Sequence, residues 1–273
     1  MKDYLNYTLY TPLLLTGPPI SYNNFFSYKE LPSPKFTYKE CLHHILLILS
    51  FEIYLHLIPI VTPNPSMTLA EMEAFSLFHL VFIWYKFLII WKTARLWSKM
   101  YGVEVIDNMS RCIFNNYGFE GFWRMWHRGF NHWLIRYLYV PLGGKSNIIS
   151  VLAVVSFVSF WHDHTINIIF WGLIIAMFMI PEIMIKRYFR KHKKHWYHTY
   201  WFKYLAGFVS SIYIHFLIIC NCIGFGYGVG EMGLVLDKIV NEYQTVICSI
   251  FIVMIPTLCM FHIRNLEGNA KNY

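Results

Sequence analysis

Apolar runs of bilayer length constrain this chain more than any other feature of its sequence. A transmembrane helix needs about 20 consecutive apolar residues. The runs that approach this length are residues 41–61, 75–91, 166–185, 203–223 and 244–261. A soluble domain carries roughly 25% charged residues, whereas this chain has 14% charged and 56% hydrophobic residues. The sequence therefore predicts an all-α fold, a polytopic transmembrane helical bundle.

We expect a single membrane domain over residues 1–273. Its parts, in chain order, are an interfacial lead-in with a Gly-Pro segment, two transmembrane helices, a polar motif region, a short helix with the following transmembrane helix, and a basic loop with two C-terminal transmembrane helices. They cover residues 1–40, 41–91, 92–145, 146–185 and 186–273. The segment GFGYGVGEMGLVLDKIV, residues 224–240, is too rich in glycine for a plain helix, so we expect a re-entrant or irregular segment that lines protein.

Lysine and arginine concentrate in residues 92–145 and 186–203, while the loops between the other apolar runs hold almost none. Because cytosolic loops carry the excess of these residues, we expect the two basic segments and both termini to be cytosolic. The run KRYFRKHKKHWYH, residues 186–198, is explained by a helix end anchored at the cytosolic headgroups. Nucleic-acid binding is the alternative for such a run.

The stretch FWRMWHRGFNHWLIRYLYVPLGG, residues 122–144, brings costly polar groups into an apolar chain. On a continuous helix, residues three and four apart are neighbours. The side chains that would then share one face are Arg124, His127, Arg128 and Asn131. An interfacial amphipathic helix explains the arginines and the tryptophans of this stretch. It does not require His127 and Asn131 on the same face, so an interfacial helix and a functional site both remain open.

A second polar cluster, WHDH at residues 161–164, follows the short apolar run 147–160. A helix over that run rises about 21 Å, against a hydrocarbon core of about 30 Å. If it starts at the cytosolic face it ends inside the membrane, and His162 then lies at a depth where ionisable groups usually face a functional cavity. A neutral imidazole in such a cavity suits general-base work. The alternative is a tight loop at the far surface.

A metal site on His162 and His164 is the other reading of this cluster. Side chains at positions i and i+2 do not converge on a helix, and no cysteine or glutamate completes a ligand set. We therefore expect no metal there.

The stretch WRMWHRGFNHWLIRYLYVPLGG, then a short apolar helix, then FWHD, resembles the signature of the membrane-bound O-acyltransferase (MBOAT) family. The opening YLNYTLYTPLLLTGPPISYNNF resembles the Gly-Pro segment of that family. The Trp-His-Asp form, with WGLIIAMFMIPEI after it, looks closest to the branch of glycerol uptake proteins and Hedgehog acyltransferases. Two departures stand out: Gly129 replaces a common serine, and the family usually has several more helices before the Gly-Pro segment. The resemblance thus implies an MBOAT-like core without those N-terminal helices.

The resemblance implies transfer of a fatty acyl group from acyl-CoA to a hydroxyl, or sometimes an amine, within the membrane. It implies that His162 is the general base and that His127, with Asn131, positions the donor or stabilises the thioester oxyanion. Arginines on the cytosolic side would meet the CoA phosphates, and residues that flank the two histidines would bind substrate. These further residues are Arg124, Arg128, Arg136, Trp126, Trp161 and Asp163.

No bound cofactor is expected on this interpretation, because acyl-CoA is a co-substrate. The expected partners are acyl-CoA, a lipid, lipid-anchor or protein acceptor and the membrane, without nucleic acid, and the family implies the endoplasmic reticulum. A non-catalytic lipid-binding or scaffold protein, or a truncated fragment, is the first alternative. A small-solute transporter is the second, although transporters are expected to show paired repeats with interrupted helices, and we find no such pairing.

Overall fold

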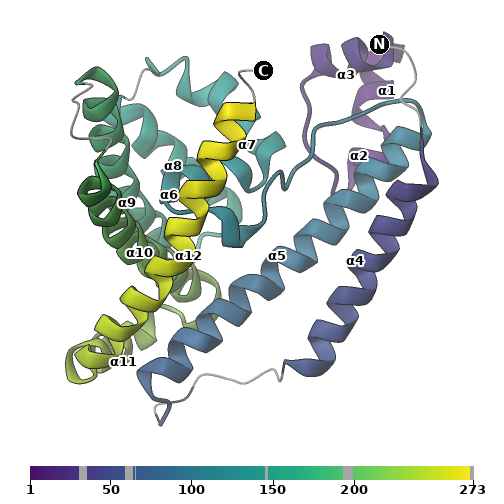
Figure 1. The fold of residues 1–273 in the computed structure, drawn as a ribbon. Coiled ribbons are helices and arrows are strands. Elements are labelled where there is room, and N and C mark those ends of the chain that lie inside the picture. Colours follow the sequence, from purple (N-terminus) through teal and green to yellow (C-terminus); the bar gives the residue numbers. More distant parts are fainter. Residues whose placement is uncertain (31–35, 59–63, 65, 145–146, 193–198, 271–273) are drawn as a thin grey trace. The chain divides into compact units, whose positions relative to one another are not determined.

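The computed structural model describes residues 1–30, 36–58, 64, 66–144, 147–192 and 199–270. These residues form helices and contain no strand. Five helices are long and apolar enough to cross a membrane, and one apolar helix is shorter. The five are α4 (Tyr38–Leu57), α5 (Leu69–Met100), α9 (Ile166–Lys191), α10 (Tyr200–Cys222) and α12 (Tyr243–Ala270), and the shorter one is α8 (Ile148–His162) (Figure 1). The prediction of an all-α, multi-pass membrane protein is confirmed.

Shorter elements connect these helices. The α-helices among them are α1 (Lys2–Thr8), α2 (Thr11–Leu14), α3 (Tyr22–Glu30), α6 (Phe119–Met125), α7 (Arg128–Leu134) and α11 (Met232–Asn241). The two 3₁₀-helices, which are wound more tightly than an α-helix, are η1 (Ile113–Asn115) and η5 (Val229–Glu231). The two π-helices, which are wider, are η2 (Ile135–Tyr139) and η4 (Ile223–Tyr227). Part of the basic run 186–198 lies outside the described residues, because residues 193–198 are not among them.

The glycine-rich segment 224–240 divides into two parts. Its first part is irregular as expected, since η4 and η5 flank Gly228, whose φ is +83°. Its second part is regular α-helix, α11, and there the expectation of an irregular segment was wrong. The reason is that no glycine follows Gly233 within α11, and the remaining residues of this helix include good helix formers and bury Val235.

The chain forms two compact units. Unit 1 contains Met1–Val61, Val81–Cys112 and Trp123–Pro141, and unit 2 contains Thr62–Leu80, Ile113–Phe122 and Leu142–Tyr273. The expectation of a single membrane domain over residues 1–273 stays a prediction. Each unit has its own packing, which is described in turn.

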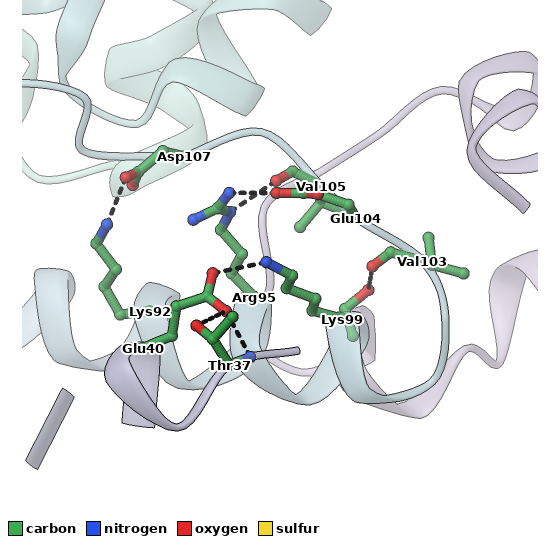
Figure 2. A network of polar contacts seen from close by, with 10 residues as sticks. Thr37, Glu40, Lys92, Arg95, Lys99, Val103, Glu104, Val105 and Asp107 are labelled. Atoms are coloured by element: carbon green, nitrogen blue, oxygen red, sulfur yellow. Dashed lines mark hydrogen bonds and ion pairs between the residues drawn. The ribbon is translucent and has the colours of Figure 1, made fainter. Parts of the chain in front are cut away.

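In unit 1, α4 runs antiparallel to the C-terminal part of α5 (Figure 1). At one end Lys99 donates to the Glu40 carboxylate at 2.6 Å (Figure 2). Further along, the ring of Phe51 stacks on Tyr85 with centroids 5.4 Å apart. Glu40 also completes a capping box with Thr37, because its Oε2 accepts the Thr37 N–H at 3.1 Å. One carboxylate therefore both starts α4 and ties it to α5.

In unit 2, small residues bring helices close together. Gly172 of α9 faces Ser159 of α8, and a β-carbon at Gly172 would overlap the Ser159 hydroxyl. Gly207 of α10 faces Leu258 of α12, where a β-carbon would stand 2.8 Å from Leu258 Cδ2. Close approach at small residues is a common way for membrane helices to pack, since lipid tails give no hydrophobic drive for association. These contacts fix α8 on α9 and α10 on α12.

A buried carboxylate links α9 to the start of α6 within unit 2. Glu182 is 8% exposed and accepts the Glu120 N–H at 3.2 Å. Lys186 donates to Glu182 at 2.5 Å and to the Glu120 carboxylate at 3.1 Å. Gly118 permits this approach, because a β-carbon there would overlap the Glu182 carboxylate. The first residues of α6 are thus fixed on α9.

We predict that Gly172→Ala lowers thermal stability, because the new methyl group collides with the Ser159 hydroxyl and overpacking costs about 1–3 kcal/mol. A thermal melt of the purified protein in detergent micelles measures the change. Ser159→Ala in the same chain should restore most of the loss, since the colliding atom is then absent. Gly233→Ala is the control, because a β-carbon there meets nothing within 4 Å. Equal melting temperatures for Gly172→Ala and wild type would contradict the close helix crossing.

Candidate active site

A strap, residues 103–109, lies along the C-terminal part of α5 and leads toward the polar motif (Figure 2). Three side chains of α5 hold it, at positions i, i+3 and i+6, which share one helix face. The pairs are Lys92 with the Asp107 carboxylate, Arg95 Nε with the Val105 carbonyl at 2.9 Å, and Ser98 Oγ with the Val103 carbonyl at 2.7 Å. Val103 and Val105 also pack with Phe25 in an apolar cluster. The strap is therefore fixed by both polar and apolar contacts.

The polar motif is not one continuous helix. α6 ends at Met125, His127 takes a left-handed backbone conformation with φ 46° and ψ 50°, and α7 begins at Arg128. The expected single face does not form, and that prediction was wrong for Arg124, His127, Arg128 and Asn131. Among the described residues, His127 is the only non-glycine with positive φ. Such a conformation is unfavourable for an L-residue, although histidine adopts it more readily than most residues, and strained residues of this kind cluster at functional sites.

At this break, Asn108 of the strap accepts two amide protons that a continuous helix would bond within itself. The Asn108 carbonyl accepts the Arg128 N–H at 3.0 Å, and its side-chain Oδ1 accepts the Gly129 N–H at 2.7 Å. In an unbroken helix these protons would go to carbonyls four residues earlier. Asn131 lies one turn into α7, half-buried, and its N–H bonds the His127 carbonyl at 3.0 Å.

Aromatic rings hold the side chain of His127. The imidazole stacks on Trp91 of α5 with centroids 4.5 Å apart and an interplanar angle of 15°. It also meets Phe130 at 5.1 Å. Trp126 packs edge-on against Trp91 at 6.4 Å and against Phe87 at 6.2 Å. Trp126, which the sequence assigned to substrate binding, therefore supports the ring on which His127 lies, and its contact with substrate stays a prediction.

The arginines assigned to CoA binding lie around α7 within unit 1. Arg124 and Arg136 are exposed, and Arg128 is half-buried. Arg136 Nη1 lies 3.5 Å from Ser21 Oγ. The pKa of His132 is lowered from its ordinary value, first by partial burial and then by the positive charges of Arg128 and Arg124. The positive charges of Arg124 and Arg128 therefore both act on His132.

His162 is the last residue of α8. Asn147 caps the start of this helix, because its Oδ1 accepts the Ile149 N–H at 3.1 Å. The helix has 15 residues, a rise of about 22 Å, against about 30 Å of hydrocarbon. The short helix that the sequence predicted is confirmed. The position of His162 at depth in the membrane follows from this length and stays a prediction.

Three aromatic rings contact the imidazole of His162, which is exposed in this structure. The centroid of Trp171 lies 5.7 Å away and that of Phe225 lies 5.6 Å away, both edge-on, and Trp161 is at 4.9 Å. Trp171 is only 2% exposed, and its indole N–H donates to the Asn221 Oδ1 at 3.4 Å. Within the part of the chain that the structure describes, neither nitrogen of His162 has a hydrogen-bond partner. The ring is therefore placed by aromatic contacts alone.

The π-helix η4 carries Phe225 to His162. Widened helical turns of this kind often occur at functional sites. Gly224 allows η4 to lie against Trp171, because a β-carbon there would stand 2.7 Å from Trp171 Cδ1. The Phe225 carbonyl lies 3.1 Å from His79 Nε2 of α5. Sequence reasoning missed Trp171, Phe225 and Asn221 as neighbours of His162. The signals near them were the segment WGLIIAMFMIPEI, which begins at Trp171, and the glycine-rich segment, which begins at Gly224.

The residues that flank His162 differ in exposure and contacts. Trp161 is 52% exposed. Asp163 is extended, and its carboxylate accepts the N–H of His164 at 2.6 Å, so it stabilises the turn between α8 and α9. The ring of His164 packs against Phe160, 5.8 Å away. Among the described residues, no three His, Cys, Asp or Glu side chains are grouped to hold a metal ion.

We predict that Gly224→Ala destabilises unit 2 and disturbs the surroundings of His162. The added methyl group must displace the buried Trp171, which loses its bond to Asn221 and its contact with His162. Unfolding in mixed micelles titrated with a denaturing detergent should reach its midpoint at a lower detergent fraction than in wild type. Gly230→Ala is the matched control, because a β-carbon there meets nothing within 4 Å. If both variants unfold like wild type, the close packing of η4 on Trp171 is wrong.

Comparison with known proteins finds one family model and several relatives that match most of this chain. The model of the membrane-bound O-acyltransferase family matches residues 1–227. The chain is 34% identical over 286 residues to the membrane-bound O-acyltransferase GUP1 of Saccharomyces cerevisiae, covering 100% of this chain and 50% of that protein. It is 33% identical to GUP1 of Candida tropicalis over 281 residues, covering 97% and 48%. It is 24% identical over 206 residues to the mouse protein-cysteine N-palmitoyltransferase HHAT, covering 67% and 40%. The chain thus spans about half the length, or less, of these relatives.

Proposed function

Because this chain belongs to the membrane-bound O-acyltransferase family, we propose that it transfers a fatty acyl group from acyl-CoA to a hydroxyl of a lipid, lipid-anchor or protein acceptor. The observation that carries the proposal is His162. Its imidazole stands at the end of a short apolar helix, among aromatic rings, with both nitrogens free of partners in the described residues. An unpaired imidazole in such surroundings is available to accept a proton from a substrate.

The chemistry assigned to His162 is general-base catalysis. The imidazole takes the proton of the acceptor hydroxyl as that oxygen attacks the carbonyl carbon of the thioester. The tetrahedral intermediate then expels the CoA sulfur, the carbon–sulfur bond breaks, and the sulfur takes up the proton from the imidazolium. A thioester is already activated, so positioning and one proton acceptor provide most of the rate enhancement.

His127 is proposed to position the donor or to stabilise the oxyanion that forms on the thioester carbonyl. Two observations support a specific role: its strained backbone and the flat stacking of its ring on Trp91. Strain of this kind persists only where the surrounding structure enforces it. The arginines near α7 would bind the CoA phosphates, which guanidinium groups can contact in pairs. The lowered pKa of His132 supports a concentration of positive charge at Arg124 and Arg128.

The acceptor and the membrane are proposed at the level that the relatives allow. GUP1 is named as an O-acyltransferase, while the more distant mouse relative is named for transfer to the nitrogen of a protein cysteine. The higher identity to GUP1 favours a hydroxyl acceptor for this chain. The endoplasmic reticulum is the proposed membrane, on the basis of the family.

We predict that His162→Ala abolishes acyl transfer, because the acceptor then has no base. The chain is expressed in membranes that lack related activity and is given labelled acyl-CoA, and label is followed into lipid and protein. His127→Ala should also lower transfer strongly. His164→Ala is the matched control, because it removes a histidine two residues away that lies on the turn and packs on Phe160. All variants are compared at equal amounts of folded membrane protein.

Each result of this experiment supports or contradicts the role of His162 as the base or the activity of this chain. Transfer by wild type and by His164→Ala, with none by His162→Ala, supports the proposal, and the labelled product identifies the acceptor class. If His162→Ala transfers label as fast as wild type, His162 is not the base. If folded wild type is as silent as His162→Ala, this chain does not catalyse the reaction by itself. It is then either a non-catalytic lipid-binding or scaffold protein or a truncated fragment.

We predict that Arg128→Gln raises the KM for acyl-CoA by about tenfold and leaves kcat nearly unchanged. The reason is that a charge-assisted contact with a phosphate contributes to donor binding and is worth roughly 1.5–3 kcal/mol. Initial rates at varied acyl-CoA concentration measure both constants. Arg190→Gln, at an exposed arginine of α9, is the control. A fall in kcat with unchanged KM would instead place Arg128 in the chemical step.

A further inference from the structure

We propose that Asn108 is a positioning residue for His127: its carbonyl and amide oxygens hold the left-handed turn that sets the His127 ring on Trp91. Both oxygens accept amide protons from the turn, those of Arg128 and Gly129. The consequence for acyl transfer rests on the proposed function, while the consequence for the conformation of His127 does not. Neither the motif nor the relatives assign Asn108 a role.

The first step of the argument is that the turn needs an external partner. α6 and α7 are both right-handed helices, and only Trp126 and His127 separate them. Local preference therefore favours one continuous helix, since a left-handed histidine is unfavourable for an L-residue. A continuous helix would pair the amide protons of Arg128 and Gly129 within itself. Because both protons bond Asn108 instead, Asn108 is the group that stabilises the break.

The second step is that Asn108 is itself held in place. It is 1% exposed and follows Asp107, which pairs with Lys92 of α5. The Arg95 and Ser98 side chains hold the strap further upstream (Figure 2). An acceptor on a fixed strap can impose a conformation on the turn, whereas an acceptor on a free loop would follow it. Through the strap, α5 thereby determines where the turn at His127 lies.

The third step is that the oxygen of the Asn108 side chain matters and the nitrogen does not. The buried Nδ2 has no hydrogen-bond partner among the described residues. A buried donor without a partner destabilises a fold, so the residue is explained by the bond that its oxygen makes. Gly129 fits the same contact, because a β-carbon there would stand 3.0 Å from Asn108 Oδ1 and 3.0 Å from the Pro19 carbonyl.

The fourth step separates positioning from catalysis. At 1% exposure, Asn108 does not touch a substrate, so its effect has to pass through His127. Without the side-chain acceptor, the turn relaxes toward the continuous helix, and the His127 ring leaves Trp91. The chemical step then slows while the donor still binds, since small misplacements of a catalytic group reduce rate steeply.

The test compares Asn108→Leu, which removes the oxygen, with Asn108→Asp, which keeps an oxygen acceptor. We expect Asn108→Leu to lower kcat by about tenfold or more with KM for acyl-CoA within about twofold, and Asn108→Asp to retain most of the wild-type kcat. Asn108→Ala is made as well, in case the leucine variant does not fold. Ser50→Ala is the matched control, because it removes a half-buried hydrogen bond within α4 of the same unit and none from the strap or the turn.

A second measurement does not depend on activity. The protein is labelled with ¹³C at the histidine Cε1 positions, and the His127 signal is identified by its loss in His127→Gln. Stacking on Trp91 shifts this signal upfield through the ring current. The shift should persist in Asn108→Asp and Ser50→Ala and disappear in Asn108→Leu or Asn108→Ala.

Every outcome supports or overturns the role of Asn108. Loss of kcat and of the upfield shift in Asn108→Leu, with both retained in Asn108→Asp, supports it. It is overturned if Asn108→Leu keeps the shift, if Asn108→Asp loses as much as Asn108→Leu, or if Ser50→Ala lowers kcat equally. If folded wild type transfers no acyl group, the proposed function fails, and the spectroscopic comparison alone then decides whether Asn108 positions His127.

Discussion

Hydrogen bonding of the backbone is the constraint on which both histidine clusters depend. In apolar surroundings an N–H or C=O without a partner is costly, so a membrane helix breaks only where another group satisfies the freed atoms. Asparagine supplies that group at two breaks. Asn108 accepts two amide protons beside His127, and Asn167 accepts the Val229 N–H at 3.0 Å where the chain leaves η4. The helices are interrupted where a short amide side chain is at hand, and these interruptions shape the surroundings of His127 and His162.

The transmembrane helices could be predicted from the sequence because an apolar run of bilayer length has few other structures available to it. Their ends were harder to predict. α5 continues to Met100, well past the apolar run that ends at residue 91, because its basic side chains find partners from other segments. Lys99 pairs with Glu40, and Arg95 pairs with the strap. Such pairs join α5 to other segments of the chain, so the local sequence pattern of α5 cannot predict them.

The two candidate histidines could likewise be found from sequence, since each stands in a motif of unusual composition. The residues that orient them could not. The break at His127 depends on Asn108, and the bond from Asn108 to Gly129 spans 21 positions. The support of Trp171 depends on Asn221, 50 positions away. A helical pattern alone predicted one continuous helix with a shared polar face, and a tertiary hydrogen bond overrode it. Motifs identify the candidate reactive side chains, but the contacts that orient these side chains form only when the chain folds.

The aromatic surroundings of His162 have one more consequence. A histidine in an enzyme usually has one nitrogen bonded to a carboxylate or carbonyl, and this bond decides which nitrogen carries the proton. In the described residues His162 has no such bond, so its two tautomers are not distinguished by the protein. On the proposed function, the acceptor selects between them when it binds. The imidazole of a general base of this kind can take up a proton at one nitrogen and release it from the other, without rotation of the ring between the two steps.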